Sequence, residues 1–177
     1  MNPNQTFPAT RRVLQLDSYW PYQLTVLADH ISRHTAAIVK RHAGLNLSQW
    51  RVMAAIAERP GRTAAEVVAV TPMDKGIVSR ATKALLEAGL VVRTASQDDG
   101  RISHLHLTDG GEAMYQSLVP RVESVSVQAQ SALGAPERQQ FETSLKRLSR
   151  LLLQLGPDDQ PDGTNARQAA MDVDTNS

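Results

Sequence analysis

The chain contains no cysteine. This absence excludes disulfide bonds, cysteine-ligated zinc sites and thiol nucleophiles, and it suits a reducing compartment. Aromatic residues are also scarce, at 4% of the sequence, whereas hydrophobic residues make up 41% and include many alanines and leucines. This balance predicts a mainly helical protein with an aliphatic core.

Long hydrophobic runs are missing as well. No apolar stretch approaches the ~20 residues of a membrane-spanning helix, and the first residues lack the apolar segment of a signal peptide. We therefore expect a cytoplasmic protein. The sequence shows no glycine-rich phosphate loop and no convincing pair of catalytic carboxylates, so we expect neither an enzyme nor a bound cofactor.

Residues 63–70 have the pattern of a short helix. Thr63 and Glu66 form a capping box, which predicts that the helix starts there. Thr71-Pro72 should end it, because the residue before a proline is pushed out of the helical region. The apolar residues expected in the core are Val67, Val68 and Val70.

A second helix follows after about three residues, which is the spacing of a helix-turn-helix. Asp74 stands at the N-cap position, and Gly89 stands where a glycine closes a helix. One predicted side is apolar and consists of Ile77, Val78, Ala81, Ala84, Leu85 and Ala88. The opposite side consists of Lys75, Gly76, Ser79, Arg80, Lys83 and Glu87. Such a side can read DNA bases and phosphates, although an ordinary solvated helix has the same pattern.

Two short strands follow this helix. Residues 90–93 and 102–107 have the composition of strands, and a polar turn with Asp99-Gly100 joins them. A helix-turn-helix followed by a β-hairpin predicts a winged helix-turn-helix that binds DNA.

The segment DKGIVSRATKALLEAGLVVR and the later DGRISHLHLTDGG resemble the MarR/SlyA family of winged helix-turn-helix regulators. The family's wing signature is Asp-x-Arg, then Leu-x-Leu-Thr-x-x-Gly. It stands here as Asp99, Arg101, Leu105, Leu107, Thr108 and Gly111. The likeness covers about residues 19–155. It implies that Arg101 enters a minor groove and is held by Asp99. It also implies that Lys75, Ser79, Arg80 and Lys83 read the major groove, with Gly76 permitting close approach.

The N-terminal part of the chain predicts two helices. The first runs from Tyr19 to about His42, and Ser48 is expected to cap the second, over residues 49–59. His30 and His34 have a spacing that can hold a metal from one helix face. No third ligand is evident near them. A metal-responsive regulator, using His30 and His34 or His104 and His106, remains an alternative interpretation.

The resemblance also implies an effector pocket between the first two helices and the DNA-binding domain. We expect Trp20, Trp50 and Arg51 among its walls, with Arg51 pairing with an anionic group. A small anionic aromatic molecule is the leading class of effector. On its position alone, Trp50 fits a core role better than a ligand-binding role.

The C-terminal third predicts two further helices after Thr108. Pro120 should bend or split the first of them, and Pro136 opens the second. The second helix carries an apolar stripe formed by Phe141, Leu145, Leu148, Leu152 and Leu155. One small domain cannot easily cover so wide a stripe, and the resemblance implies that these helices form a homodimer. A two-fold dimer implies a palindromic operator.

These observations predict five regions. They are a flexible arm (1–18), a first helix for dimerisation and the pocket (19–47), a winged helix-turn-helix (48–108), dimerisation helices (109–155) and a disordered acidic tail (156–177). The predicted function is a homodimeric transcriptional regulator, by family habit a repressor, that binds double-stranded DNA and responds to a small molecule. The alternatives are the metal-responsive regulator and a winged-helix module that binds only protein.

Overall fold

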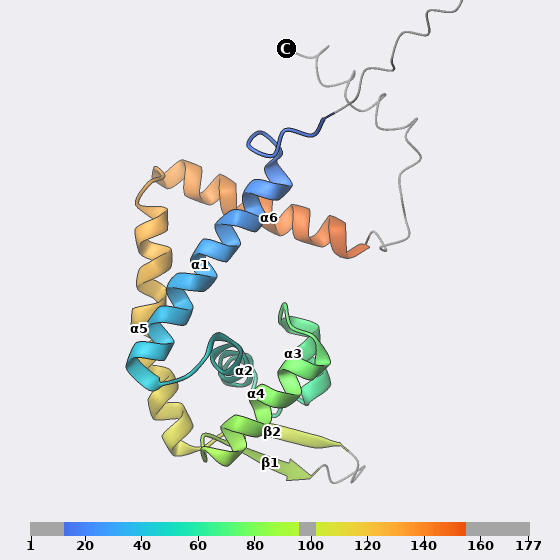
Figure 1. Ribbon diagram of the computed structural model, residues 1–177, viewed down its shortest axis with the longest axis vertical. Coiled ribbons are helices and arrows are strands. Elements are labelled where there is room, and N and C mark those ends of the chain that lie inside the picture. The colour runs from blue at the N-terminus through green and yellow to red at the C-terminus, as the bar shows by residue number, and fades with distance from the viewer. Residues whose placement is uncertain (1–12, 96–101, 155–177) are drawn as a thin grey trace, which may run out of the picture. The chain divides into compact units, whose positions relative to one another are not determined.

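The structure is a computed structural model and describes residues 13–95 and 102–154 (Figure 1). The chain divides into two compact units, residues 1–129 and 130–177. The elements are α1 (Trp20–Ala43), α2 (Leu47–Glu58), α3 (Ala64–Val70), α4 (Lys75–Glu87), β1 (Val91–Ala95), β2 (Ser103–Leu107), α5 (Asp109–Gln130) and α6 (Ala135–Gln154). The prediction of a mainly helical chain with one β-hairpin is confirmed. Within the described ranges, no helix is long and apolar enough to cross a membrane.

Local capping signals explain where α1 and α2 begin and end. α1 has a proline in its first turn and ends at Gly44, whose φ of 68° is a left-handed conformation that glycine adopts without strain. The cap of α2 is Asn46, whose side chain accepts a hydrogen bond from the backbone N–H of Gln49 at 2.9 Å. The Gln49 side chain accepts one in return from the Asn46 backbone N–H. The prediction that Ser48 caps this helix was therefore wrong.

α3 and α4 form the helix-turn-helix as predicted. Thr63 and Glu66 form the capping box of α3, and the helix ends before Thr71. Asp74 caps α4 by accepting a hydrogen bond from the Ile77 backbone N–H at 2.7 Å. Val67 is fully buried, but Val70 is 52% exposed, so its predicted place in the core was wrong. A seven-residue helix presents less than two full turns to the core, and Val70 lies at its exposed end.

A Schellman motif closes α4 and leads the chain into the wing. The N–H of Leu90 donates to the Leu85 carbonyl and the N–H of Gly89 donates to the Leu86 carbonyl, both at 3.0 Å. β1 then pairs with β2 in an antiparallel ladder from Val91–Leu107 to Ala95–Ser103.

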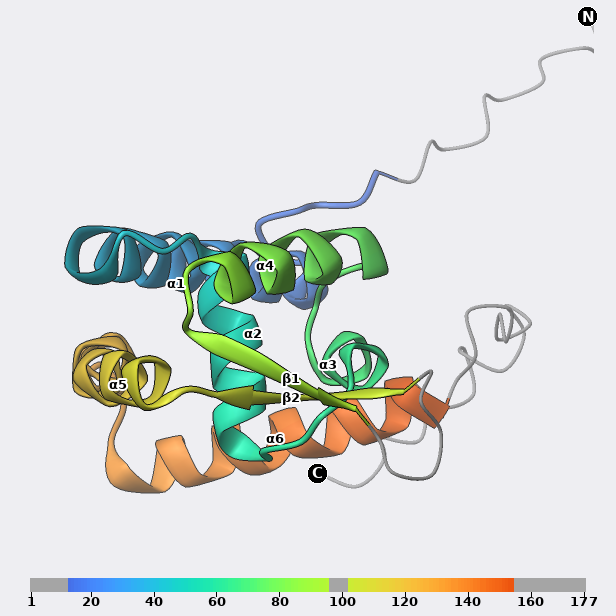
Figure 2. The same ribbon diagram turned by 90° about the horizontal axis from the view of Figure 1, so that it is seen from below.

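The outer edge of β2 is also hydrogen-bonded. The Gly61 N–H donates to the Leu105 carbonyl, and the Leu105 N–H donates to the Arg62 carbonyl, each at 2.9 Å. The segment between α2 and α3 thus lies along β2 like a short third strand. Figure 2 shows the hairpin side by side with the ends of α2 and α3.

One aliphatic core holds α2, α3, α4 and the hairpin together. Its fully buried members include Met53, Ile56, Val67, Val78, Leu85, Leu105 and Leu118. Trp50 belongs to the same core and stacks on Tyr115 of α5, with 5.3 Å between ring centroids and 19° between planes. The core interpretation of Trp50 is therefore confirmed.

The start of α5 is fixed against the end of α4 by a close backbone approach. A Cβ on Gly111 would lie 2.0 Å from the Leu90 carbonyl oxygen, so only glycine fits there. The Thr108 hydroxyl donates to the Gly89 carbonyl at 2.8 Å and accepts from the Gly111 N–H at 3.0 Å. α5 then runs through Pro120 without interruption, which excludes the split that we considered.

α6 follows Gly134, whose N–H donates to the Glu137 carboxylate at 2.5 Å. None of the described residues of α6 is buried. Phe141, Leu151, Leu152 and Leu153 are exposed large hydrophobic residues, and the predicted stripe member Leu155 lies outside the described residues.

Candidate nucleic-acid interface

α4 presents one buried side and one exposed side. Val78, Ala81, Thr82 and Leu85 are buried against the core. All six residues predicted to face outward are exposed, namely Lys75, Gly76, Ser79, Arg80, Lys83 and Glu87. The predicted orientation of the helix is therefore confirmed, except that Ala88 is exposed rather than buried. The burial of Thr82 was not predicted, since a threonine carries no clear signal in an apolar pattern.

The exposed side of α4 has unpaired positive charge near its N-terminal end. Lys83 lies 3.8 Å from the Glu87 carboxylate, an exposed pair of small energetic value. In the described parts of the chain, no carboxylate forms an ion pair with Lys75 or Arg80. A Cβ on Gly76 would lie 3.5 Å from Nη1 of Arg80 and 3.2 Å from Oδ1 of Asp74. The contact with Arg80 would be an ordinary one, whereas the Asp74 carboxylate would have to shift by a few tenths of an ångström.

The wing is only partly described. Asp99 and Arg101, the predicted wing residues, lie outside the described residues. The stem adds an exposed cation that the sequence interpretation did not single out, Arg93 of β1. Strand alternation would not have identified it, because Arg93 pairs with the buried Leu105 and directly opposite residues of an antiparallel ladder share one face.

The base of the wing is anchored by Arg62 and His104. Arg62 is 8% exposed, and its guanidinium donates to the Ala55 carbonyl and to the Glu58 carboxylate, both at 2.6 Å. His104 Nδ1 lies 2.8 Å from the Gly61 carbonyl oxygen. Because a carbonyl only accepts, this nitrogen carries the proton, and it is not free to bind a metal in this arrangement.

The alternative of a metal-responsive regulator gains no support. His30 and His34 are both exposed on α1. Over the residues that the structure covers, no group of three or more His, Asp or Glu side chains is placed to hold a metal ion.

The three predicted pocket residues have different surroundings. Trp50 packs on Tyr115 in the core, whereas Arg51 donates to the Ser32 hydroxyl of α1 at 3.1 Å. Trp20 opens α1 and is 49% exposed. Burial raises the pKa of the Tyr115 hydroxyl above its usual 10.0, and the carboxylates of nearby glutamates add to this shift. The Tyr115 hydroxyl therefore stays protonated beside Trp50.

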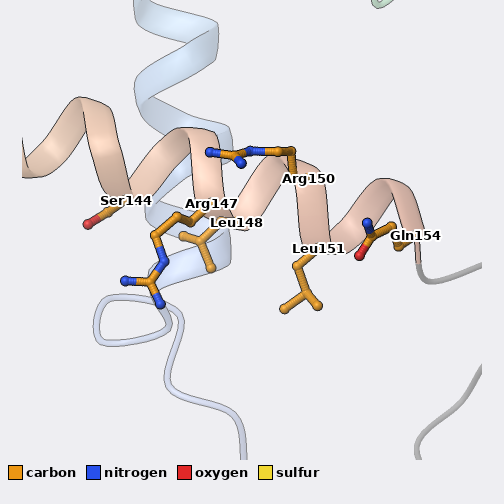
Figure 3. A pocket seen from close by; sticks show the side chains of 6 residues that line it. All are labelled: Ser144, Arg147, Leu148, Arg150, Leu151 and Gln154. Atoms are coloured by element: carbon orange, nitrogen blue, oxygen red, sulfur yellow. The ribbon is translucent and has the colours of Figure 1, made fainter.

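A large open hollow of about 650 Å³ lies along α6. Figure 3 shows the side chains that line it, with Leu148 and Leu151 pointing to the same side of the helix. The described residues that line it all belong to α6.

Comparisons with known proteins agree with this geometry. Residues 43–102 match the MarR family. The chain is 31% identical over 108 residues to the homoprotocatechuate degradative operon repressor of Escherichia coli, covering 59% of this chain and 70% of the repressor. The fold resembles that of a MarR/EmrR family transcriptional regulator from Acinetobacter sp. ADP1, with a TM-score of 0.73, 20% identity, and coverage of 80% of this chain and 100% of the other.

A further solved structure with the same fold is that of Bordetella bronchiseptica BpsR, whose DNA binding is regulated by 6-hydroxynicotinic acid. Its TM-score is 0.60 at 22% identity, with coverage of 72% of this chain and 98% of BpsR. The helix-turn-helix, the wing and these likenesses together lead to one conclusion: the chain belongs to the MarR family of winged helix-turn-helix transcriptional regulators.

Proposed function

We propose that this protein is a homodimeric repressor that binds a palindromic operator and is released by a small anionic effector. The observation that carries the proposal is the exposed side of α4. Lys75 and Arg80 lie there without carboxylate ion-pair partners in the described chain, and Ser79 lies exposed beside them. The opposite side of the helix is buried. An α-helix so arranged can enter the major groove and donate to guanine edges or phosphates.

The wing supplies the second contact in this proposal. Arg101 would enter the adjacent minor groove, with Asp99 holding its guanidinium. The wing stem is well placed to support such a contact, because β2 is hydrogen-bonded on one edge to β1 and on the other to Gly61 and Arg62. Hydrogen bonds on both edges fix the stem of the wing to the core.

Exposed apolar residues support the homodimer. Trp20, Leu27 and Ile31 of α1 are each more than 40% exposed, as are Leu151, Leu152 and Leu153 of α6. Burial of such side chains yields roughly 25 cal/mol for each Å² of apolar surface removed from water. We assign residues 19–47 and 109–155 to the dimer and the effector pocket, residues 48–108 to DNA binding, and residues 1–18 and 156–177 to an arm and a tail. Two-fold symmetry then requires a palindromic site with half-sites about one helical turn apart.

The effector is proposed to bind near Arg51, whose guanidinium reaches from α2 to Ser32 on α1. A carboxylate can replace the serine hydroxyl as a stronger partner of this guanidinium. The regulation of BpsR by 6-hydroxynicotinic acid supports a small aromatic acid as the class of effector. Trp20 and Trp50 remain the other proposed wall residues.

DNA affinity across a salt series tests the proposal. The wild type should bind DNA from upstream of its own gene more tightly than random DNA, with a steep dependence on salt. Arg80→Ala should lose about 1–3 kcal/mol chiefly on the specific site, and Arg101→Ala should lower the salt slope by about one. Arg121→Ala removes an exposed cation of α5 and is the matched control, with unchanged affinity expected. DNA binding without any salt dependence, or none at low salt, would refute the proposal.

The dimer is tested separately by sedimentation. Leu152→Glu should shift the protein from dimer towards monomer, because it places a charge on the apolar side of α6. Gln140→Glu adds the same charge on a polar position of that helix and should leave the dimer intact. A monomeric wild type would contradict the homodimer.

A further inference from the structure

Arg62 is a buried cation at the end of α2. One nitrogen of its guanidinium, Nη1, donates to the Ala55 carbonyl and to the Glu58 carboxylate, both at 2.6 Å. The Ala55 carbonyl also accepts the Arg59 N–H, at a long 3.4 Å. Carbonyls in the last turn of a helix lack partners within the helix, and a cation there is favourable. The Arg62 side chain therefore closes the end of α2.

The backbone around the same residue is bonded to the wing. The Arg62 carbonyl accepts the Leu105 N–H, and the Leu105 carbonyl accepts the Gly61 N–H, each at 2.9 Å. The His104 ring adds a bond to the Gly61 carbonyl. Across the ladder, Leu105 pairs with Arg93 of β1. The hairpin lies beside the end of α2 in Figure 2. Arg62 thus joins α2 to the wing, through its side chain on one side and its backbone on the other.

Stability alone does not explain a cation at this position. The Arg62 Nε is buried as well and has no hydrogen-bond partner among the residues that the structure describes. A buried guanidinium with an unsatisfied nitrogen costs more to desolvate than an apolar side chain of similar size. An apolar side chain would fill the same space but could not bond the end of α2. Because the Glu58 side chain is 70% exposed, water would hydrate its carboxylate if Arg62 were removed, and the main loss would be the fixed position of residue 62.

We propose that Arg62 is a positioning residue for DNA binding, which fixes the wing on α2 so that Arg101 can reach the DNA. The Arg62 guanidinium is buried and touches no DNA itself. Its loss would let residues 59–63 and the attached β2 shift away from α2, and the contact of the wing with DNA would weaken. The recognition helix α4 would keep its place, because Asp74 caps it and its buried residues pack in the aliphatic core. The effect on DNA rests on the proposed function, whereas the effect on the position of the wing does not.

Residual dipolar couplings of the backbone amides test the position of the wing in the full-length protein without DNA, because they report the orientation of each N–H. In the wild type, the couplings of β1 and β2 should fit the same alignment as those of α2 and α4. In Arg62→Met, whose side chain is of similar length but has no donor, the strand couplings should shrink while the helix couplings still fit the wild-type fold. Arg59→Met removes an exposed cation of the same segment and should behave like the wild type. Strand couplings in Arg62→Met that still fit the alignment of the helices would overturn the proposal.

Double-mutant cycles test the effect on binding to DNA from upstream of the gene. Arg62→Met alone should weaken binding about tenfold, the value of one well-placed contact. In an Arg101→Ala protein the wing contact is already lost, so Arg62→Met should change the Kd by less than about twofold, whereas in an Arg80→Ala protein it should keep its full effect. A substitution that only unfolds part of the protein lowers affinity by the same factor in all three proteins. Equal factors would therefore overturn the proposal.

Glu58→Ala is a milder test in case Arg62→Met does not fold. It releases one of the two bonds of Nη1 and leaves the bond to the Ala55 carbonyl. It should change the couplings and the Kd in the same pattern, by smaller amounts. Displaced strand couplings with an unchanged Kd would overturn the role of Arg62 in DNA binding. If the wild type binds no DNA, the proposed function fails, and the couplings still decide whether Arg62 fixes the wing.

Discussion

Replacement of Gly111 by alanine is expected to strain the junction between α4 and α5. The added Cβ would lie 2.0 Å from the Leu90 carbonyl oxygen, whereas real Cβ atoms essentially never approach within 3.0 Å. The backbone would have to separate by about 1 Å there. That carbonyl also accepts the Thr108 N–H at 3.1 Å, and Thr108 in turn holds the Gly111 N–H. Because the clash involves backbone rather than a flexible side chain, it cannot be relieved by a rotamer change.

The cost of this clash can be estimated from overpacking. Extra methyl groups in packed sites cost about 1–3 kcal/mol, and a backbone clash belongs at the upper end, so we expect about 3 kcal/mol. For a chain of this size, each kcal/mol lowers Tm by about 2–4 °C, which predicts a decrease of about 6–12 °C. Thermal melting followed by circular dichroism measures this decrease. All variants should be melted at one protein concentration, because oligomers make Tm concentration-dependent.

Gly110 provides a matched control one residue away. A Cβ at Gly110 would have Thr108 Oγ1 as its nearest neighbour at 3.8 Å, an ordinary contact. Gly110→Ala should therefore leave Tm unchanged or raise it slightly, because the higher helix propensity of alanine stabilises the fold by up to about 1 kcal/mol. If Gly111→Ala melted like Gly110→Ala, the close approach of α5 to Leu90 would not exist, and the argument from the junction would be wrong.

Three further substitutions test other parts of the fold. Asp74→Ala removes the acceptor for the Ile77 N–H and should cost about 1 kcal/mol in urea unfolding, whereas Asp74→Asn should cost much less because it keeps an acceptor. Leu118→Ala leaves a cavity at a fully buried position and should cost about 2–5 kcal/mol; a cost no larger than that of the exposed Leu153→Ala would contradict its burial. The Thr63 backbone N–H and then the Arg59 guanidinium lower the pKa of Glu66 below its usual 4.5, so its contribution to stability is present above pH 4.5 and is lost as the pH falls through the lowered pKa. Glu66→Gln should therefore show a smaller decrease of Tm on acidification than the wild type, and identical pH profiles would show that Glu66 adds nothing.

The helix-turn-helix could be predicted from the sequence because its signals are local. Thr63, Asp74 and Gly89 each fix a helix end through bonds to residues within a few positions. The start of α2 shows how such signals compete. Asn46 and Ser48 are both good caps, but only Asn46 has a glutamine three residues later to complete a capping box. The pair of Asn46 and Gln49 is visible in the sequence, and it determines where α2 begins.

Features that depend on tertiary packing could not be predicted. The exposure of Val70 depends on how little of α3 reaches the core, and a period-based pattern does not contain that information. A hollow of about 340 Å³ beside α4 is lined by Ala65, Thr82 and Arg93 among others. Because these residues come from three elements, no spacing along the chain reveals it. The partners of Arg51 and Trp50 could not be predicted either, because they come from other elements. Ser32 of α1 contacts Arg51, and Tyr115 of α5 stacks on Trp50.

The bonds between Gly61 and Leu105 have a consequence for how the protein opens. A lone two-stranded hairpin is marginally stable in water and would exchange its amide hydrogens by separating from the domain. Here the Leu105 N–H is bonded to the connection between α2 and α3, and its side chain is in the core. Its deuterium uptake should therefore follow global unfolding and slow down with any substitution that stabilises α2. The base of the wing unfolds with the domain, so the wing has no independent hinge at Leu105.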